Sequence, residues 1–337
     1  MKEFLKLDYK KFNDANLIKI LSEFGNPHKI KILYLSTYNS DYTRTETLLS
    51  LFKKNNIDYK AILTEKLRFK YFKIISELIK NQKDYDVIFV AFRGQETLPF
   101  IKIFSKKPII FDAFISVYDT LCFDRRKFNP NSATGKFFKW YDSYLCKISN
   151  TVLVDTKTHK DYFKREFNAK NIDYLYLGCN EKLFKPLKIK KRSSKFVVFW
   201  YGQANPLQGV DIILNAAKIL EDKNIQFRIV GPVRKKYSKL INNLNLKNVE
   251  FIDYIPYNQL PLEINKSNVC LGGHFGNRNK SRRVIAGKTF QFLSCGKPTI
   301  IGDNPANREI FKESSNLRFV KMNESEDLAR KILEMRR

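Results

Sequence analysis

The chain has 337 residues, of which 43% are hydrophobic, which is enough to fill two domain cores of ordinary size and excludes a disordered protein. Its 62 Lys and Arg residues against 34 Asp and Glu give a formal charge of +28, and such a charge attracts a protein to polyanionic surfaces such as anionic lipid or nucleic acid. No run approaches the roughly 18 apolar residues that cross a bilayer, and the first residues lack the apolar core of a secretory signal. We therefore expect a cytoplasmic protein.

The first half of the chain alternates short apolar runs with segments of helical period, which is typical of parallel strands covered by helices. The residues before Ile30 form an added segment of helix or loop. The strands expected in this half span 30–36, 59–63, 87–91, 108–111 and 151–154. The segment 186–195 then combines a proline, five cations and two serines, and this composition predicts a linker.

A second series of the same kind follows the linker. Its expected strands span 196–201, 226–230, 249–252, 269–271 and 299–301, and a final helix runs from about 326 to 335. The predicted fold class is α/β, with two Rossmann-like doubly wound domains that face a cleft. The first domain spans 1–185, of which 1–29 are the added segment, and the second spans 196–337. Ligands of such sheets bind beyond the carboxyl ends of the strands.

Two stretches of the second domain have the composition of an anion site. Gly202 ends the strand at 196–201, and a glycine there lets the backbone approach a ligand closely. Between the strand at 269–271 and a helix that begins near Lys288 lies a loop that contains Lys280 and Arg283. Cations at a helix N-terminus favour a phosphate or diphosphate, and the alternatives are an ordinary strand-to-helix turn and a solvated basic loop.

The first domain contains polar residues after two of its strands. Asp119 and Arg125 follow the strand at 108–111, where a carboxylate can orient a hydroxyl and an arginine can bind phosphate. A salt-bridged surface loop is the alternative. His159 begins a helix beyond the strand at 151–154, and it is either a capping or packing residue or a group of the same cleft.

Two helical segments are both basic and aromatic. They span 66–80 and 136–147, and both place lysines among Phe, Tyr or Trp residues. Such helices either cover a sheet or lie on an anionic membrane. The cysteines are five in number and scattered, and there are three histidines and no Cys-x-x-Cys, so we expect reduced thiols and no metal site.

Several of these runs together resemble retaining glycosyltransferase family 4, of the GT-B type, over about residues 30 to 335. In the second domain the likeness lies in Phe199-Trp-Tyr-Gly with Pro206-Leu-Gln-Gly-Val, in Arg228-Ile-Val-Gly, and in Arg283-Val-Ile-Ala-Gly-Lys with Cys295-Gly-Lys-Pro. In the first domain it lies in Phe111-Asp, Ser116-Val-Tyr-Asp-Thr, Asp124-Arg and Val152-Leu-Val-Asp-Thr followed by His159. The order and the spacing of these runs make the likeness specific.

The resemblance implies a nucleotide-sugar donor, a UDP- or GDP-sugar, whose diphosphate lies between the Gly202 loop and the helix at Lys288. Lys280, Arg283 and Lys288 are then the candidate cations, and Gln203 and Gln208 stand near the place where relatives have an Arg and a Lys. Relatives also have two glutamates eight residues apart at the donor, and this chain has Arg283 and Gln291 there.

The implied reaction retains the anomeric configuration, needs no cofactor and no metal, and relies on cations that stabilise the leaving diphosphate. Asp119 is the candidate for positioning the acceptor hydroxyl, with Arg125 and His159 beside it. The expected acceptor is a glycan or a polyprenyl-diphosphate-linked intermediate of surface polysaccharide or glycoconjugate synthesis, reached from the inner face of the cell membrane. The alternatives are an inactive GT-B partner of an active transferase, a basic polyanion-binding protein, and an epimerase or hydrolase on the same fold. We expect no specific nucleic-acid partner, because no recognisable module for one is present.

Overall fold

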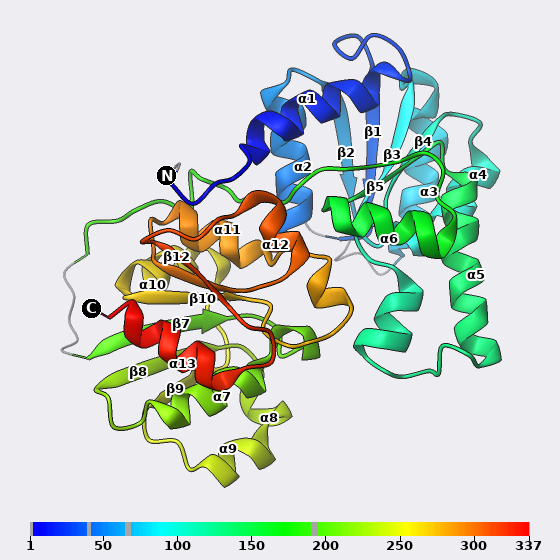
Figure 1. The fold of residues 1–337 in the computed structure, drawn as a ribbon. Coiled ribbons are helices and arrows are strands. Elements are labelled where there is room, and N and C mark those ends of the chain that lie inside the picture. The colour runs from blue at the N-terminus through cyan, green and yellow to red at the C-terminus, as the bar shows by residue number, and fades with distance from the viewer. Residues whose placement is uncertain (1–2, 39–41, 65–68, 190–194, 337) are drawn as a thin grey trace. The chain divides into compact units, whose positions relative to one another are not determined.

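A computed structural model describes residues 3–38, 42–64, 69–189 and 195–336. The chain divides into two compact units (Figure 1). One unit is Asp8–Gly178, and the other combines Met1–Leu7 with Cys179–Arg337. In the described part of the chain, no helix combines the length and the apolar character that a bilayer span requires.

The first unit contains one six-stranded sheet in which all neighbouring strands are parallel. Its strand order is β2-β1-β3-β4-β5-β6. The strands are β1 (Lys31–Ser36), β2 (Asp58–Leu63), β3 (Val87–Val90), β4 (Ile109–Asp112), β5 (Thr151–Val154) and β6 (Ile172–Tyr174). The central strands β3, β4 and β5 are buried at every residue, because helices cover both faces of the sheet.

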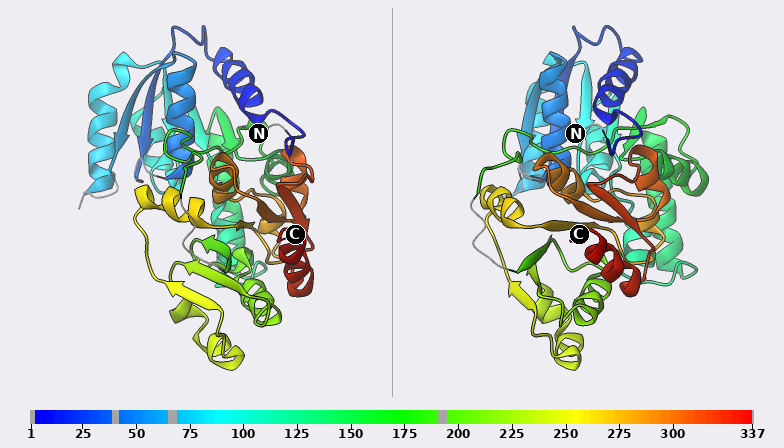
Figure 2. Two further views of the ribbon diagram at one scale, coloured as in Figure 1. Left: turned by 90° about the vertical axis from the view of Figure 1, so that its left-hand side faces the viewer. Right: turned by 60° about the vertical axis from the view of Figure 1, so that its left-hand side comes forward.

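The helices of the first unit pack in two layers. Buried side chains of α1 (Tyr9–Ser22) and α2 (Thr43–Lys54) share one core with one face of the strands. Those of α3 (Lys70–Asn81), α4 (Leu98–Phe104), α5 (Ala133–Ile148) and α6 (Lys157–Phe167) share a second core on the other face. Figure 2 shows the two layers from further sides.

The second unit repeats this architecture with a second six-stranded parallel sheet, in the order β12-β11-β10-β7-β8-β9. The strands are β7 (Phe196–Tyr201), β8 (Ile225–Val230), β9 (Val249–Ile252), β10 (Val269–Gly273), β11 (Thr299–Gly302) and β12 (Leu317–Val320). The helices are α7 (Val210–Ile219), α8 (Val233–Lys236), α9 (Ser238–Leu244), α10 (Leu260–Lys266), α11 (Gly287–Ser294), α12 (Pro305–Ile310) and α13 (Ser325–Glu334). Helices α7 and α13 lie side by side over one face, whereas α10 and α11 contribute to a core on the other (Figure 1).

The α/β fold class with two doubly wound sheets is confirmed, and the ten predicted strands all occur within two residues of their expected ends. The prediction missed β6 and β12, which form one edge of each sheet. Both strands are short and are not apolar throughout, because Asp173 lies inside the first and Arg318 inside the second. An edge strand needs less apolar surface than a central one, so its sequence signal is weaker.

The structure divides the chain at Gly178, a few residues before the linker expected at 186–195. Residues 190–194 of that linker lie outside the described residues. The preceding stretch is already bound to the second unit, because the Leu187 N–H donates to Asn265 Oδ1 at 2.9 Å. The first residues of the chain also belong there, since the Lys6 N–H donates to the Ile310 carbonyl at 2.9 Å and Leu5 forms a β-bridge with Phe311.

Candidate functional site

The second sheet has a topological switch point between β7 and β10. From β7 the chain continues outward through β8 and β9, and from β10 it continues the other way through β11 and β12. Ligands of open parallel sheets bind outside the carboxyl ends of the two strands at such a point. Gly202 directly follows β7, and His274 directly follows β10.

Lys288, in the first turn of α11, is buried at this point. Its Nζ donates to the Tyr201 carbonyl at 3.0 Å and to Gln208 Oε1 at 2.6 Å. It also lies 4.3 Å from the centre of the Trp200 ring, within the range of a cation–π interaction. Burial lowers the pKa of the Lys288 ammonium well below its ordinary value. Both oxygen partners are neutral, so a bound anion would supply the charge that they lack.

Two glycines bring backbone segments together around this lysine. Gly202 has a φ of +150°, and a Cβ there would lie 3.3 Å from Lys288 Nζ. Gly209, at the start of α7, has a φ of +66°, and a Cβ there would lie 2.4 Å from the Gly276 nitrogen. The loop after β7 therefore packs against the segment after β10 so closely that a side chain at Gly209 is not accommodated.

His274 is buried beside Lys288, and its Nδ1 has no hydrogen-bond partner. Burial, with a further contribution from the Lys288 charge and a smaller one from Lys280, lowers the pKa of His274 to about 3. The imidazole is therefore neutral at physiological pH. Lys280 and Lys288 both act electrostatically on this one ring, which places two of the predicted cations in the same neighbourhood.

Replacing His274 by glutamine is expected to reduce the acid sensitivity of the second unit. Between the ordinary pKa of 6.5 and about 3, the unfolded chain binds a proton at His274 that the folded chain does not, so the free energy of unfolding falls as pH falls through this range. From pH 7.5 to pH 5 this proton accounts for about 2 kcal/mol. Urea unfolding followed by Trp200 fluorescence measures it. His28→Gln, at an exposed histidine, is the control. If the free energy of unfolding falls equally between pH 7.5 and pH 5 in wild type and in His274→Gln, the buried neutral state of His274 is contradicted.

The other residues that were predicted to bind the nucleotide-sugar donor occupy different environments. Lys280 is buried in the short turn η6 (Lys280–Arg282), Arg283 is half-buried directly after it, and Gln203 is exposed on the loop after β7. Gln291 is buried, and both ends of its amide contact side chains of its own unit. The Tyr201 hydroxyl donates to Gln291 Oε1, and Gln291 Nε2 donates to the Tyr257 hydroxyl at 3.3 Å.

Gln208, which with Gln203 stands where relatives have an Arg and a Lys, is a partner of Lys288. It ends the turn η4 (Pro206–Gln208), immediately before Gly209. The signal available in the sequence was its place in the loop between β7 and α7, which the resemblance marks as a donor loop. A glutamine oxygen at 2.6 Å holds the ammonium in place without neutralising it.

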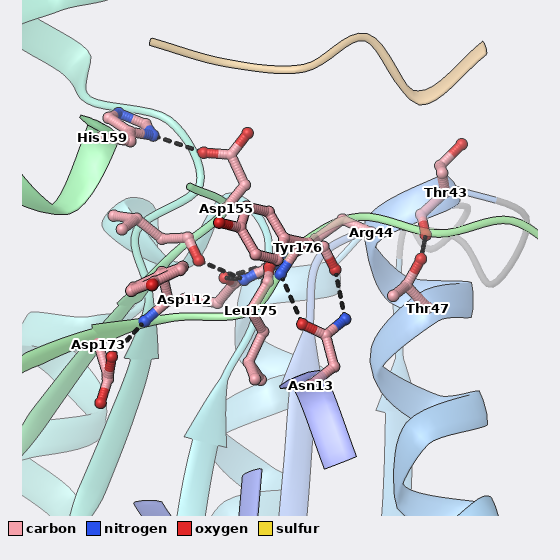
Figure 3. A network of polar contacts seen from close by, with 12 residues as sticks. Asn13, Thr43, Arg44, Thr47, Asp112, Asp155, His159, Asp173, Leu175 and Tyr176 are labelled. Carbon is pink, nitrogen blue, oxygen red and sulfur yellow. Dashed lines mark hydrogen bonds and ion pairs between the residues drawn. The ribbon is translucent and has the colours of Figure 1, made fainter. Parts of the chain in front are cut away.

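In the first unit, polar side chains gather where β4 and β5 end (Figure 3). Asp112 ends β4 and forms a fully buried ion pair with Arg44 of α2, at 2.7 Å. Arg44 also donates to the Leu175 carbonyl at 2.5 Å and to the Val154 carbonyl at 3.2 Å. Burial opposes its charge, but the charge and hydrogen bonds of Asp112 outweigh that effect and raise the pKa of Arg44.

His159 lies in the same region, in the first turn of α6. Its Nδ1 is 2.7 Å from Asp155 Oδ1, and both side chains are buried (Figure 3). The Thr156 hydroxyl caps the helix by accepting from the His159 N–H at 3.0 Å. Nε2 of His159 has no hydrogen-bond partner. The residue is thus part of a buried carboxylate–imidazole pair, and its backbone, not its ring, takes part in the helix cap.

Asp119 and Arg125 lie at opposite ends of a π-helical turn, η3 (Asp119–Asp124). Asp119 is buried, and its N–H donates to Ser116 Oγ at 2.9 Å. Asp142 of α5 holds this end of the turn by accepting from Ser116 Oγ at 2.6 Å and from the Tyr118 N–H at 2.9 Å. Arg125 follows the turn and is exposed. One of these two predicted residues is therefore buried and the other exposed.

Among the described residues, no group of three or more His, Cys, Asp or Glu side chains is arranged to hold a metal ion. The groups present are cations with neutral hydrogen-bond acceptors at the second sheet, and a buried network of carboxylates, arginine and imidazole at the first. The former suit a bound anion, and the latter fix the loops that follow β4 and β5.

Comparison with known proteins identifies what this arrangement is similar to. Residues 181–336 match the family described as glycosyl transferases group 1. HepE from Anabaena, solved in complex with UDP-glucose, has a TM-score of 0.64 and 14% identity, over 90% of this chain and 89% of that chain. A sucrose-phosphate synthase from Thermosynechococcus elongatus has a TM-score of 0.67 and 14% identity, over 91% and 90%. A glycosyltransferase from Rickettsia africae has a TM-score of 0.61 and 13% identity, over 91% and 88%.

No curated protein matches the sequence. At these identities the solved structures show the fold, which is the GT-B arrangement of two Rossmann-like domains.

Proposed function

From residues 181–336, which belong to the glycosyl transferases group 1 family, we infer that this protein moves a sugar from a nucleotide-sugar donor to an acceptor. The observation that carries the proposal is Lys288, a buried cation with neutral partners at the switch point of the second sheet. A nucleoside diphosphate fits such a place, because its negative charge would pair with the ammonium, whose two oxygen partners are neutral.

The donor is a UDP- or GDP-sugar, and UDP is the first choice. The structures of Anabaena HepE contain UDP or UDP-glucose, and that protein shares the fold of this chain. Lys288, Lys280 and Arg283 supply positive charge near the carboxyl ends of β7 and β10. As the glycosidic bond to the diphosphate breaks, negative charge develops on the leaving group, and cations fixed beforehand stabilise it.

Transfer proceeds with retention at the anomeric carbon and without a metal ion. The first unit supplies the acceptor side, where Asp119 positions the acceptor hydroxyl and Arg125 binds its phosphate. His159 serves at the same loops through the Nε2 that its pairing with Asp155 leaves available. The acceptor is a glycan or a polyprenyl-diphosphate-linked glycan of a surface polysaccharide or glycoconjugate. The protein works in the cytoplasm at the anionic inner face of the cell membrane, to which its charge of +28 attracts it.

A second candidate is an inactive GT-B partner of an active transferase. Gln291, one of the two residues that stand where the resemblance places donor glutamates, is held between the hydroxyls of Tyr201 and Tyr257. Nucleotide binding by the purified protein without any transfer of sugar would favour this candidate.

UDP is expected to raise the melting temperature of the purified protein by several degrees. A ligand at about 100 times its dissociation constant adds roughly 2.7 kcal/mol to the folded state. The measurement is a thermal-shift screen with UDP, GDP, ADP, CMP and dTDP, and inorganic polyphosphate controls for charge alone. One nucleotide clearly above polyphosphate identifies the donor class. Equal shifts with all of them would contradict donor binding and favour a basic polyanion-binding protein.

A further inference from the structure

The first unit exposes large apolar side chains on three neighbouring helices. We call six of them the apolar face: Phe69 and Phe72 at α3, Phe100 and Ile103 on α4, and Phe137 and Trp140 on α5. Each of the six is more than half exposed to solvent. Single exposed apolar residues are ordinary, but a group on adjacent helices marks an interaction surface.

The three helices lie next to one another in the layer that covers one face of the first sheet (Figure 1). Their inward residues are fully buried in the core of that layer: Ile74 and Leu78 of α3, Leu98 and Ile101 of α4, and Leu145 of α5. Each helix thus has one apolar side against the sheet and a second apolar side toward solvent. The inward side packs in the core, whereas the outward side is mostly exposed to solvent.

The rings of α5 are ordered along the helix. The ring centroids of Phe137 and Trp140 are 5.8 Å apart. Those of Trp140 and Tyr144 are 5.6 Å apart, and the two rings meet at an interplanar angle of 12°. The Tyr141 hydroxyl donates to the Gln95 carbonyl at 2.6 Å, which ties this row to the loop before α4. Tyr141 also stacks on Phe137, with ring centroids 6.1 Å apart, so this end of the exposed row contacts a side chain that the fold holds in place.

Positive charge surrounds the apolar face. The exposed lysines on these helices or within two residues of their ends are Lys73, Lys80, Lys83, Lys102, Lys106, Lys136, Lys139 and Lys147. Lys139 is paired with Glu166 of α6 at 3.1 Å. The three helices contain only two carboxylates. Asp142 is buried as the cap of η3, and Glu77 is paired with Lys73 at 2.8 Å. The surface is apolar and cationic together.

This combination decides between two kinds of occupant. Lysine is depleted at protein–protein interfaces, and a second copy docked on this face would bring lysines against lysines. An anionic bilayer accepts both features, because aromatic rings insert at the headgroup level while lysine stems extend along them toward phosphates. We propose that α3, α4 and α5 dock the first unit on an anionic lipid bilayer through the apolar face. This docking rests on the membrane location proposed above, and it names the surface that makes the contact.

Trp140 makes the docking directly measurable. The chain has two tryptophans, and the other, Trp200, is buried in the second unit. Vesicles of phosphatidylcholine with phosphatidylglycerol should therefore shift the emission of Trp140 to shorter wavelength and protect it from acrylamide. Vesicles of phosphatidylcholine alone should do so at least tenfold more weakly, and raising the salt from 0.1 to 0.5 M should release the protein. This measurement uses the wild-type chain and needs no variant to fold.

Sedimentation with the same vesicles tests the residues. Phe72→Ser, Ile103→Ser and Trp140→Ser together, one from each helix, should weaken binding by at least tenfold. The matched control changes three exposed apolar residues of the second unit, Ile219→Ser, Tyr254→Ser and Leu262→Ser, and should bind like wild type.

Three outcomes would overturn the proposal. They are no binding to anionic vesicles at 0.1 M salt, equal binding by the Phe72, Ile103, Trp140 variant and wild type, and a wild-type dimer that this variant dissociates without any vesicle binding. The last would assign the face to a second copy of the chain. No nucleotide or acceptor enters these measurements, so failure of the docking and failure of the proposed transfer reaction are seen separately.

Discussion

Lys288→Met is expected to lower the affinity for UDP at least 100-fold and to remove the thermal shift that UDP produces. The reason is the environment of the ammonium, which is buried, donates to two neutral oxygens and lies over an indole ring. A diphosphate bound there gains a charge-assisted hydrogen bond in a site of low dielectric, and losing such a contact costs about 3 kcal/mol. Isothermal titration with UDP gives the affinity.

The same substitution should leave the protein without nucleotide nearly as stable as wild type. Burial disfavours the charged form of Lys288, and methionine fills the same volume without that penalty. We expect the free energy of unfolding to stay within about 1 kcal/mol of wild type, measured by urea unfolding. A variant that loses UDP binding together with several kcal/mol of stability would point to a structural role for the lysine instead.

Lys297→Met is the matched control, because Lys297 follows the other end of α11. Its Nζ donates to the Ser267 carbonyl at 2.8 Å, and Ser267 precedes β10, at the end of that strand opposite to His274. Removing this cation lowers the net charge as much as removing Lys288. UDP affinity within about twofold of wild type would show that position, not total charge, decides binding.

The sequence predicted the parts of this molecule that depend on continuous burial. Strands such as β7 are covered on both faces, so their residues are apolar in one run, and this pattern identified ten strands. The Lys288 site was predicted only in part. Lys288, Gly202 and the loop were named from the sequence, because their residue types and order carry a signal, and their role at a donor site stays a prediction.

The partners of Lys288 were not predicted, because a backbone carbonyl and the face of a buried ring leave no mark in the sequence. The pairing of Asp155 with His159 was also missed, although their spacing of four residues places both at the start of α6. No feature of the sequence around Arg44 indicated that this arginine is buried. It is one of 62 basic residues, and nothing local distinguishes a buried arginine from the exposed ones.

Asp112→Asn is expected to destabilise the first unit by about 3 to 5 kcal/mol, because it leaves the buried guanidinium of Arg44 without its carboxylate. Arg44 joins α2 to the Val154 and Leu175 carbonyls, so the loss should spread to β5 and to the segment after β6. Hydrogen exchange measured by mass spectrometry over residues 109–112 and 151–154 in urea reports this unit alone. Asp161→Asn, in the exposed pair with Lys157 of the same unit, is the control and should cost at most about 1 kcal/mol.

The Arg44→Leu, Asp112→Leu double variant separates pairing from packing. If the penalty of Asp112→Asn comes from an unpaired buried charge, removing both charges recovers much of it, since an apolar pair of similar volume is tolerated where a lone charge is not. Equal losses in the single and double variants would assign the energy to the Val154 and Leu175 carbonyls that Arg44 also binds. In either case α2, β4, β5 and the segment after β6 are joined at one guanidinium, and the segments that contain Asp119, Asp155 and His159 follow directly from the two strands β4 and β5.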